Sequence, residues 1–213
     1  MKLIQRITLF AFASAILMFA LGGAAHAQDK PGTQQVEPGA LVEALKSGGN
    51  VIYFRHAATD QAQQDSSPVD FKSCATQRNL SDKGKEQAST IGKTFGLLGV
   101  KVSKVYASPY CRAVDTAKLA FGEVTVVPDL EFAIAKSEAE AKRLGRVLRK
   151  MLENQPPKGT NTVIVAHSAN LKEAIDIFPQ PEGVAHIFRY QDGRLTHVGR
   201  VPPEQWAALA KNK

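Results

Sequence analysis

The sequence is poor in the residues that build metal and redox sites. Its two cysteines, Cys74 and Cys111, lack the Cys-x-x-Cys spacing of a zinc or thioredoxin-like site. His186 and His197 have no histidine partner at i, i+4 spacing. We therefore expect no metal and no cofactor, and interpret these two histidines as structural or surface residues.

Other features are also absent. No basic run with interleaved aromatic residues occurs, so nucleic acid is not an expected partner. No internal repeat or low-complexity tract occurs, and the length suits one domain with a full core. The formal net charge of +7 suits anionic ligands, and the basic residues are scattered along the chain.

Long hydrophobic runs are absent except at the N-terminus. There, Lys2 and Arg6 precede the apolar stretch Ile7–Leu21, and Ala25–Ala27 has the small-x-small form of a cleavage site. The stretch is shorter than the roughly 20 residues that span a bilayer, and no nearby cysteine could accept a lipid. We predict a signal peptide over residues 1–27, a flexible leader over 28–37 and one domain over 38–213. The mature protein would be periplasmic or secreted, without stable membrane insertion.

Strand-like and helix-like patterns alternate along the rest of the chain. Strands are predicted at Val51–Phe54, Val102–Ala107, Val124–Val127 and Thr162–Ala166, with a hairpin of Gly183–Tyr190 and Leu195–Val201. Helices are predicted at Pro38–Lys46, Ser81–Leu98, Ser108–Phe121, Glu138–Glu153, Ser168 to about Phe178, and Pro203–Lys211. The highly charged helix at Glu138–Glu153 is interpreted as a solvated outer face. This alternation predicts an α/β fold with a mainly parallel sheet.

Polar side chains gather where predicted strands end. Arg55 and His56 end the first strand, Ser108 and then Arg112 follow the second, and His167 ends the Thr162–Ala166 strand. The carboxyl ends of parallel strands meet in one crevice, and guanidinium groups with helix N-termini suit a dianion such as phosphate. An imidazole with a pKa of roughly 6.5 is a competent nucleophile in such a site.

Four segments resemble the motifs of the histidine phosphatase superfamily, in the branch related to cofactor-dependent phosphoglycerate mutase. Arg55–Thr59 is similar to its Arg-His-Gly-x-Thr/Ser signature, with Ala57 in the place of glycine. Leu80–Ala88 is similar to Leu-Thr/Ser-x-x-Gly-x-x-Gln-Ala, Ser108–Ala117 to Ser-x-x-x-Arg-Ala-x-x-Thr-Ala, and Val165–His167 to the strand that carries the second histidine. The Arg-x-Pro extension and His-Asp pair of the acid phosphatase and phytase branch are missing.

The resemblance implies a three-layer α/β/α sandwich and a set of roles. His56 would be the nucleophile that accepts the phosphoryl group, while Arg55, Arg112 and His167 would hold the phosphoryl oxygens. Thr59, Ser168 and Asn170 would assist in binding the substrate. The choice of His56 over His167 rests on the family, since both histidines end strands.

The general acid is less well defined by the sequence. Glu131 is similar to the Leu-x-Glu position that supplies the proton donor in many relatives. Asp129 is the neighbouring alternative, and Asp60 and Asp65 in the first loop are weaker candidates.

Cys74 lies in the long loop Gln61–Asn79, and Cys111 lies beside Arg112. Both cysteines could border the same crevice, and cysteines of exported chains are more often paired than free. We predict a Cys74–Cys111 disulfide; the alternative is that Cys111 is a small buried residue.

The sequence thus predicts a phosphatase that hydrolyses a small phosphorylated molecule through a phosphohistidine. A mutase is disfavoured, because export would separate it from cytosolic sugar phosphates. Two alternatives stay open: a non-catalytic phospho-ligand binding module on the same fold, and a phosphatase specific for an envelope phosphoglycolipid. Specificity is expected in residues 61–79 and 132–137, which match no motif.

Overall fold

The computed structural model describes residues 37–211. The predicted signal peptide, and the predicted leader apart from Glu37, lie outside the described residues. None of the helices within residues 37–211 is long and apolar enough to cross a membrane.

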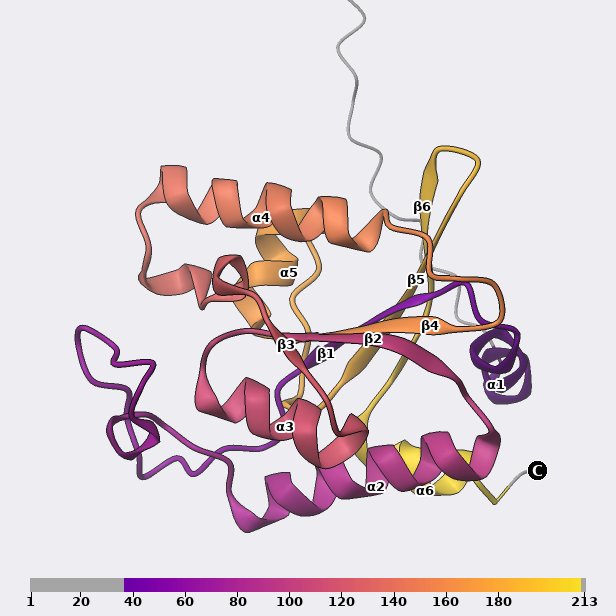
Figure 1. The fold of residues 1–213 in the computed structure, drawn as a ribbon, viewed down its shortest axis with the longest axis horizontal. Helices are drawn as coiled ribbons and strands as arrows, with labels where there is room; N and C mark the ends of the chain where they lie inside the picture. The colour runs from indigo at the N-terminus through magenta and orange to yellow at the C-terminus, as the bar shows by residue number, and fades with distance from the viewer. Residues whose placement is uncertain (1–36, 212–213) are drawn as a thin grey trace, which may run out of the picture.

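One sheet of six strands forms the centre of the molecule, in the order β3-β2-β4-β1-β5-β6 (Figure 1). Strands β1, β2, β3 and β4 are parallel, whereas β5 runs antiparallel to β1 and pairs with β6 as a hairpin. The strands are β1 (Val51–Arg55), β2 (Val102–Ala107), β3 (Thr125–Val126), β4 (Asn161–Ala166), β5 (Ala185–Gln191) and β6 (Arg194–Val201). The predicted mainly parallel α/β sheet is confirmed.

Helices cover both faces of this sheet, which gives the three layers seen in Figure 1. Ile52 and Phe54 of β1 pack with side chains of four helices on one face, and Val51 and Tyr53 pack with two helices on the other. The first set is α1 (Pro38–Ser47), α2 (Asp82–Leu98), α3 (Cys111–Phe121) and α6 (Trp206–Leu209); the second is α4 (Glu138–Leu152) and α5 (Ser168–Ile175). The side chains of Val51–Phe54 are buried on both faces of β1 because helices cover both faces of the sheet.

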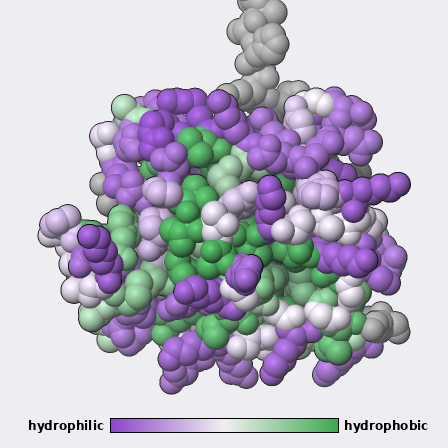
Figure 2. Space-filling model, viewed as in Figure 1, coloured by the Kyte–Doolittle hydropathy of each residue, from purple (hydrophilic) through white to green (hydrophobic). Residues whose placement is uncertain are grey.

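The interpretation of the charged helix as a solvated outer face is only half correct. Leu144, Leu148 and Leu152 of α4 are fully buried, and they recur at the spacing that places side chains on one helical face. The charged residues occupy the opposite face, which is hydrophilic in Figure 2. A high density of charge in the sequence hid a regular amphipathic pattern.

Three predicted helix ends were wrong. Ser108 does not cap α3, which begins at Cys111 after Tyr110, so Ser108 is left free for the site described below. α5 ends at Ile175 rather than near Phe178, because Asp176 adopts a left-handed conformation with φ of 62°. The C-terminal helix is divided into a 3-10 turn over Pro203–Gln205 and the short α6.

Candidate active site

The three central strands deliver the predicted site residues to one edge of the sheet. β1 lies between β4 and β5, and β4 pairs with β2, so His56, His167 and Ser108 follow adjacent strands. The rings of His56 and His167 meet edge to face with centroids 5.3 Å apart. The predicted convergence of the two histidines is therefore present.

His56 is held in one tautomer. Its Nδ1 lies 3.0 Å from the carbonyl oxygen of Ala57, and because a carbonyl can only accept, Nδ1 carries the proton. Nε2 consequently carries the lone pair. Burial, and then the positive charge of Arg112, lowers the pKa of His56 well below its usual value. The ring is therefore neutral near neutral pH.

His167 is fixed from several sides. Tyr53 donates its hydroxyl to the His167 carbonyl at 2.6 Å, and a hydrogen bond of 2.8 Å joins Ser108 Oγ to His167 Nε2. The rings of Tyr110 and Phe132 pack against the imidazole at 4.8 and 5.0 Å. Burial, and then repulsion by His56 and Arg112, lowers its pKa well below the usual value. Nδ1 is buried without a hydrogen-bond partner among residues 37–211, so it is the ring atom available to a ligand.

Arg112 lies in the first turn of α3, as predicted, and its side chain is almost completely buried. Its Nη1 donates to Asp65 Oδ1 at 2.8 Å, and its guanidinium stands 4.3 Å from the centroid of the Tyr110 ring. Asp65, considered above as a weak proton donor, is therefore the counter-charge of Arg112. The pair places the long loop over the site.

Arg55 and Thr59 meet at a residue that the sequence reasoning missed. Glu182 accepts hydrogen bonds from Arg55 Nη2 at 3.2 Å, from the Thr59 backbone N–H at 2.9 Å and from the Thr59 hydroxyl at 3.1 Å. Arg78, also missed, is 3.5 Å from the same carboxylate. Neither residue lies in one of the four motif segments that resemble the superfamily. The sequence offered no signal for them beyond a charged side chain in a loop.

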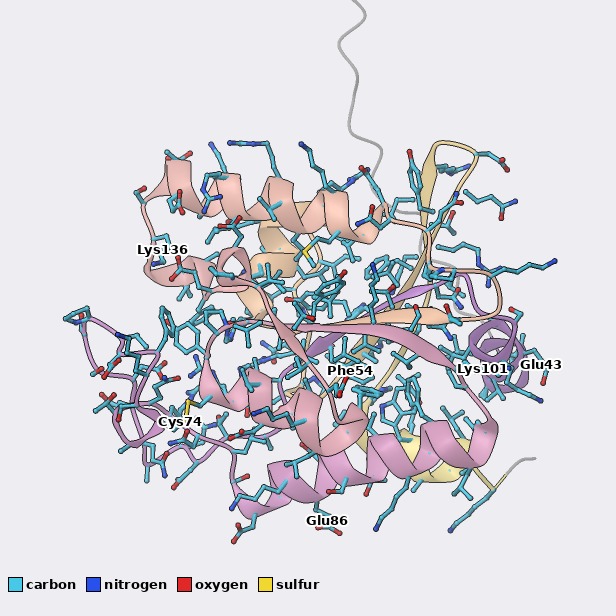
Figure 3. The ribbon with its side chains drawn as sticks, in the orientation of Figure 1. Glu43, Phe54, Cys74, Glu86, Lys101 and Lys136 are labelled. Carbon is cyan, nitrogen blue, oxygen red and sulfur yellow. A yellow bond between two sulfur atoms is a disulfide. The ribbon has the colours of Figure 1, made fainter. Side chains whose placement is uncertain are left out.

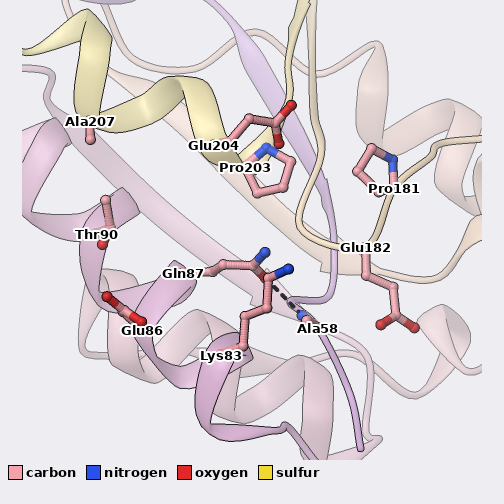
Figure 4. Close-up of a pocket in the computed structure, with 10 residues that line it drawn as sticks. All are labelled: Ala58, Lys83, Glu86, Gln87, Thr90, Pro181, Glu182, Pro203, Glu204 and Ala207. Atoms are coloured by element: carbon pink, nitrogen blue, oxygen red, sulfur yellow. Dashed lines mark hydrogen bonds between the residues drawn. The ribbon is translucent and has the colours of Figure 1, made fainter. Parts of the chain in front are cut away.

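Glu182 also faces a groove of about 500 Å³ on the side of α2 and α6 (Figure 4). There the Ala58 N–H donates to Gln87 Oε1 at 3.0 Å, so the loop after His56 is supported from behind by α2. The groove shares Ala58 and Glu182 with the site.

The two candidate proton donors differ in their surroundings. Glu131 forms an ion pair of 2.8 Å with Lys136, and its neighbour Phe132 packs on His167, so Glu131 borders the site. Asp129 is instead paired with Arg143 of α4 at 2.8 Å. The arrangement favours Glu131 over Asp129.

Ser168 and Asn170 occupy the first turn of α5, beside His167. Asn170 is completely buried and its Nδ2 donates to the Glu131 carbonyl at 2.8 Å, while its Oδ1 has no partner among residues 37–211. It positions the segment that carries Glu131. Ser168 is also buried, at the start of the helix.

The long loop is tied to the site by a disulfide. Cys74 and Cys111 are bonded, with Cα atoms 5.7 Å apart, and Gln77 Oε1 accepts the Cys111 N–H at 2.9 Å (Figure 3 labels Cys74). The pairing chosen from the sequence is present in the structure. Among residues 37–211, no three His, Cys, Asp or Glu side chains cluster as metal ligands would.

One family model matches part of the chain. Residues 51–135 match the family model described as "Histidine phosphatase superfamily (branch 1)". The match covers less than half of the 213 residues, and it falls on the same superfamily that the sequence motifs resemble. The matched superfamily contains phosphomonoesterases, which is the enzyme class predicted from the sequence.

Solved structures show the same histidine phosphatase fold. A phosphoserine phosphatase variant of Entamoeba histolytica bound to phosphoserine has a TM-score of 0.53 and 16% identity, over 73% of this chain and 98% of that chain. The same enzyme with 3-phosphoglyceric acid and the α-ribazole phosphatase of Shigella flexneri each have a TM-score of 0.53 and 16% identity, over 72% of this chain and 96% of theirs. No curated protein sequence matches the chain.

Proposed function

We propose that this protein is a histidine phosphatase that hydrolyses a small phosphomonoester through a phosphohistidine on His56. The observation that carries the proposal is the state of His56: neutral, with Nδ1 satisfied by Ala57 and Nε2 carrying a lone pair beside Arg112. Phosphoryl transfer depends mainly on positioning and positive charge, which the surrounding arginines supply. No step of the reaction written below needs a metal.

In the first step, His56 Nε2 attacks phosphorus, the N–P bond forms and the P–O bond to the leaving group breaks. Arg55, Arg112 and His167 Nδ1 hold the phosphoryl oxygens, with Thr59 and Ser168 at the margin of the site. Glu131 is the general acid and gives a proton to the departing alkoxide. This assignment uses the position of Glu131 beside Phe132 and the second histidine.

In the second step, water attacks the phosphohistidine and the N–P bond breaks. The Glu131 carboxylate accepts the proton of the water, inorganic phosphate leaves, and His56 returns to its neutral form. The same carboxyl group therefore serves as acid and then as base.

We further propose that the protein works outside the cytoplasm, after removal of residues 1–27. The Cys74–Cys111 disulfide supports this, because disulfides persist in oxidising compartments. An envelope phosphoglycolipid remains a candidate substrate within this proposal. Phosphoserine and α-ribazole 5′-phosphate, substrates suggested by the names of structural relatives, belong in the first screen with it.

The test is turnover of p-nitrophenyl phosphate by the purified mature protein and by His56→Ala. We expect turnover by the wild type only, and an acid-labile, alkali-stable phosphoryl label that is lost with His56. His186→Asn is the matched control, because it removes another buried imidazole whose ring pairs with His197 and not with His56 or His167. Phosphate binding without turnover would instead indicate the non-catalytic module, and full activity in His56→Ala would refute the mechanism.

A further inference from the structure

Three guanidinium groups surround the two histidines, and only two of them belong to the superfamily motifs. The third is Arg78, at the end of the long loop. The Nε atoms of Arg55, Arg78 and Arg112 are all buried, and none makes a hydrogen bond to any residue within 37–211. Buried donors are normally satisfied, so three unsatisfied cationic donors around one crevice indicate an anionic ligand.

Arg78 is connected to the motif arginines on both sides. Its backbone N–H donates to Asp65 Oδ1 at 2.9 Å, and the same oxygen accepts from Arg112 Nη1 at 2.8 Å. Its carbonyl oxygen accepts from Arg112 Nη1 at 3.3 Å. Its own Nη2 is 3.5 Å from Glu182 Oε1, the carboxylate that holds Arg55. Arg78 thus bridges the groups that hold Arg55 and Arg112.

The local charge requires a third cation. Asp65 and Glu182 offset two of the three guanidinium charges, and both histidines are neutral. Without Arg78, the two carboxylates would cancel the two motif arginines, and a phosphate dianion would enter a site with no net positive charge. The positive charge of Arg78 acts on both rings, since it contributes to the lowered pKa of His56 and of His167.

We propose that Arg78 is a further phosphate-binding residue, the third guanidinium of the site, which donates to an oxygen of the substrate phosphoryl group. This deepens the proposed function and rests on it. The ligand class is the phosphoryl dianion itself, so Arg78 acts on every substrate of the enzyme rather than selecting among alcohols.

The loop presents Arg78 from a fixed position. Cys74 is bonded to Cys111 at the start of α3, and Gln77 Oε1 accepts the Cys111 N–H. Gln77 is 2% exposed and also donates to the Asp70 carbonyl at 2.9 Å. The residue before Arg78 is therefore anchored beside Arg112, so little ordering is needed when a ligand binds.

The experiment measures the binding of inorganic phosphate by calorimetry, which does not depend on turnover. The inhibition constant of orthovanadate against p-nitrophenyl phosphate is the second measurement. We compare Arg78→Gln with Lys72→Gln, which removes one exposed positive charge from the same loop. A lost hydrogen bond to a charged group corresponds to about 10- to 100-fold weaker binding in Arg78→Gln. Lys72→Gln should stay within about 2-fold of the wild type, because exposed charges are screened.

Two further measurements separate direct binding from an indirect effect. Urea unfolding should give Arg78→Gln an unchanged denaturant dependence, which shows that the fold is kept. In a double-mutant cycle with Glu182→Gln, the loss caused by Arg78→Gln should persist. If it disappears in that background, Arg78 acts only through Glu182 and the proposal is wrong.

The remaining outcomes are equally decisive. In one outcome, the wild type binds phosphate, Arg112→Gln weakens that binding and Arg78→Gln does not. The proposed function then stands, and Arg78 has no part in binding. If the wild type binds neither phosphate nor vanadate, the proposed function itself fails.

Discussion

A buried histidine pair should make this protein sensitive to acid. His186 of β5 and His197 of β6 are 5% and 4% exposed, their rings are stacked with centroids 5.1 Å apart, and His186 Nδ1 lies 3.1 Å from His197 Nε2. Of the two interpretations made from the sequence, structural or surface residues, this burial agrees with the structural one. Burial, then His197 and Arg200, lowers the pKa of His186 to about 3.

The sign of the effect follows from proton uptake. In the unfolded chain His186 has a pKa of roughly 6.5, so at any pH between that value and about 3 the unfolded state binds more protons than the folded state. The free energy of unfolding therefore decreases as the pH falls through this window. The slope approaches about 1.4 kcal/mol per pH unit, so His186 alone removes about 2 kcal/mol by about pH 5.

The assay is urea unfolding of the wild type and His186→Asn at a series of pH values from about 7.5 to 4.5. The variant changes the stability at neutral pH for packing reasons, so the slopes are compared rather than the absolute values. We expect the wild type to lose about 2 kcal/mol more than the variant between neutral pH and about pH 5. Parallel curves for the two proteins would show that His186 titrates normally in the folded state, and would refute the reasoning.

Three further predictions concern the site and its supports. Glu131→Gln should slow hydrolysis of an alkyl phosphate by about 10²- to 10⁴-fold and affect p-nitrophenyl phosphate much less, because only the alkoxide needs a proton donor; equal losses would oppose that role. Replacing Cys74 and Cys111 with alanine opens a loop of 37 positions and should lower the free energy of unfolding by up to about 4 kcal/mol, measured by urea unfolding under non-reducing conditions; an unchanged midpoint would contradict it. A Cβ at Gly84 would stand 1.9 Å from a carbonyl oxygen of the loop after His56, so Gly84→Ala should destabilise by about 1–3 kcal/mol and reduce turnover, whereas Gly96→Ala in the same helix has open space and should be neutral or slightly stabilising.

The parts of the fold that the sequence predicted well are those fixed by local patterns. Val51–Phe54 of β1 and Val163–Ala166 of β4 are apolar runs because both sheet faces are covered. α2 begins at Asp82, directly after the N-cap Ser81, whose side chain accepts the Gly84 N–H. The hairpin turn was also predictable: Asp192 and Gly193 have φ of 52° and 75°, which the Asp-Gly pair accommodates. Each of these signals lies within a few residues of the structure it specifies.

The start of α3 was missed because a tertiary contact outweighs the local signal. Ser108 followed by Pro109 is typical of an N-cap, yet the Ser108 hydroxyl is hydrogen-bonded to His167, 59 positions away. The same reasoning covers Glu182 and Arg78. Their roles depend on the path of two loops in space, and no local pattern encodes that path.

The glycine-to-alanine change at Ala57 shows how the structure decides a point that the sequence left open. Ala would be costly if that position needed a positive φ, but the non-glycine residues with positive φ among those described are Asp176 and Asp192. Ala57 is completely buried, packs with Leu80 and Ala88, and donates its N–H to Thr116 Oγ1 at 3.0 Å. The position therefore requires a small side chain and not left-handed backbone. The carbonyl that fixes the His56 tautomer keeps its place with alanine, so the departure from the superfamily signature leaves His56 undisturbed.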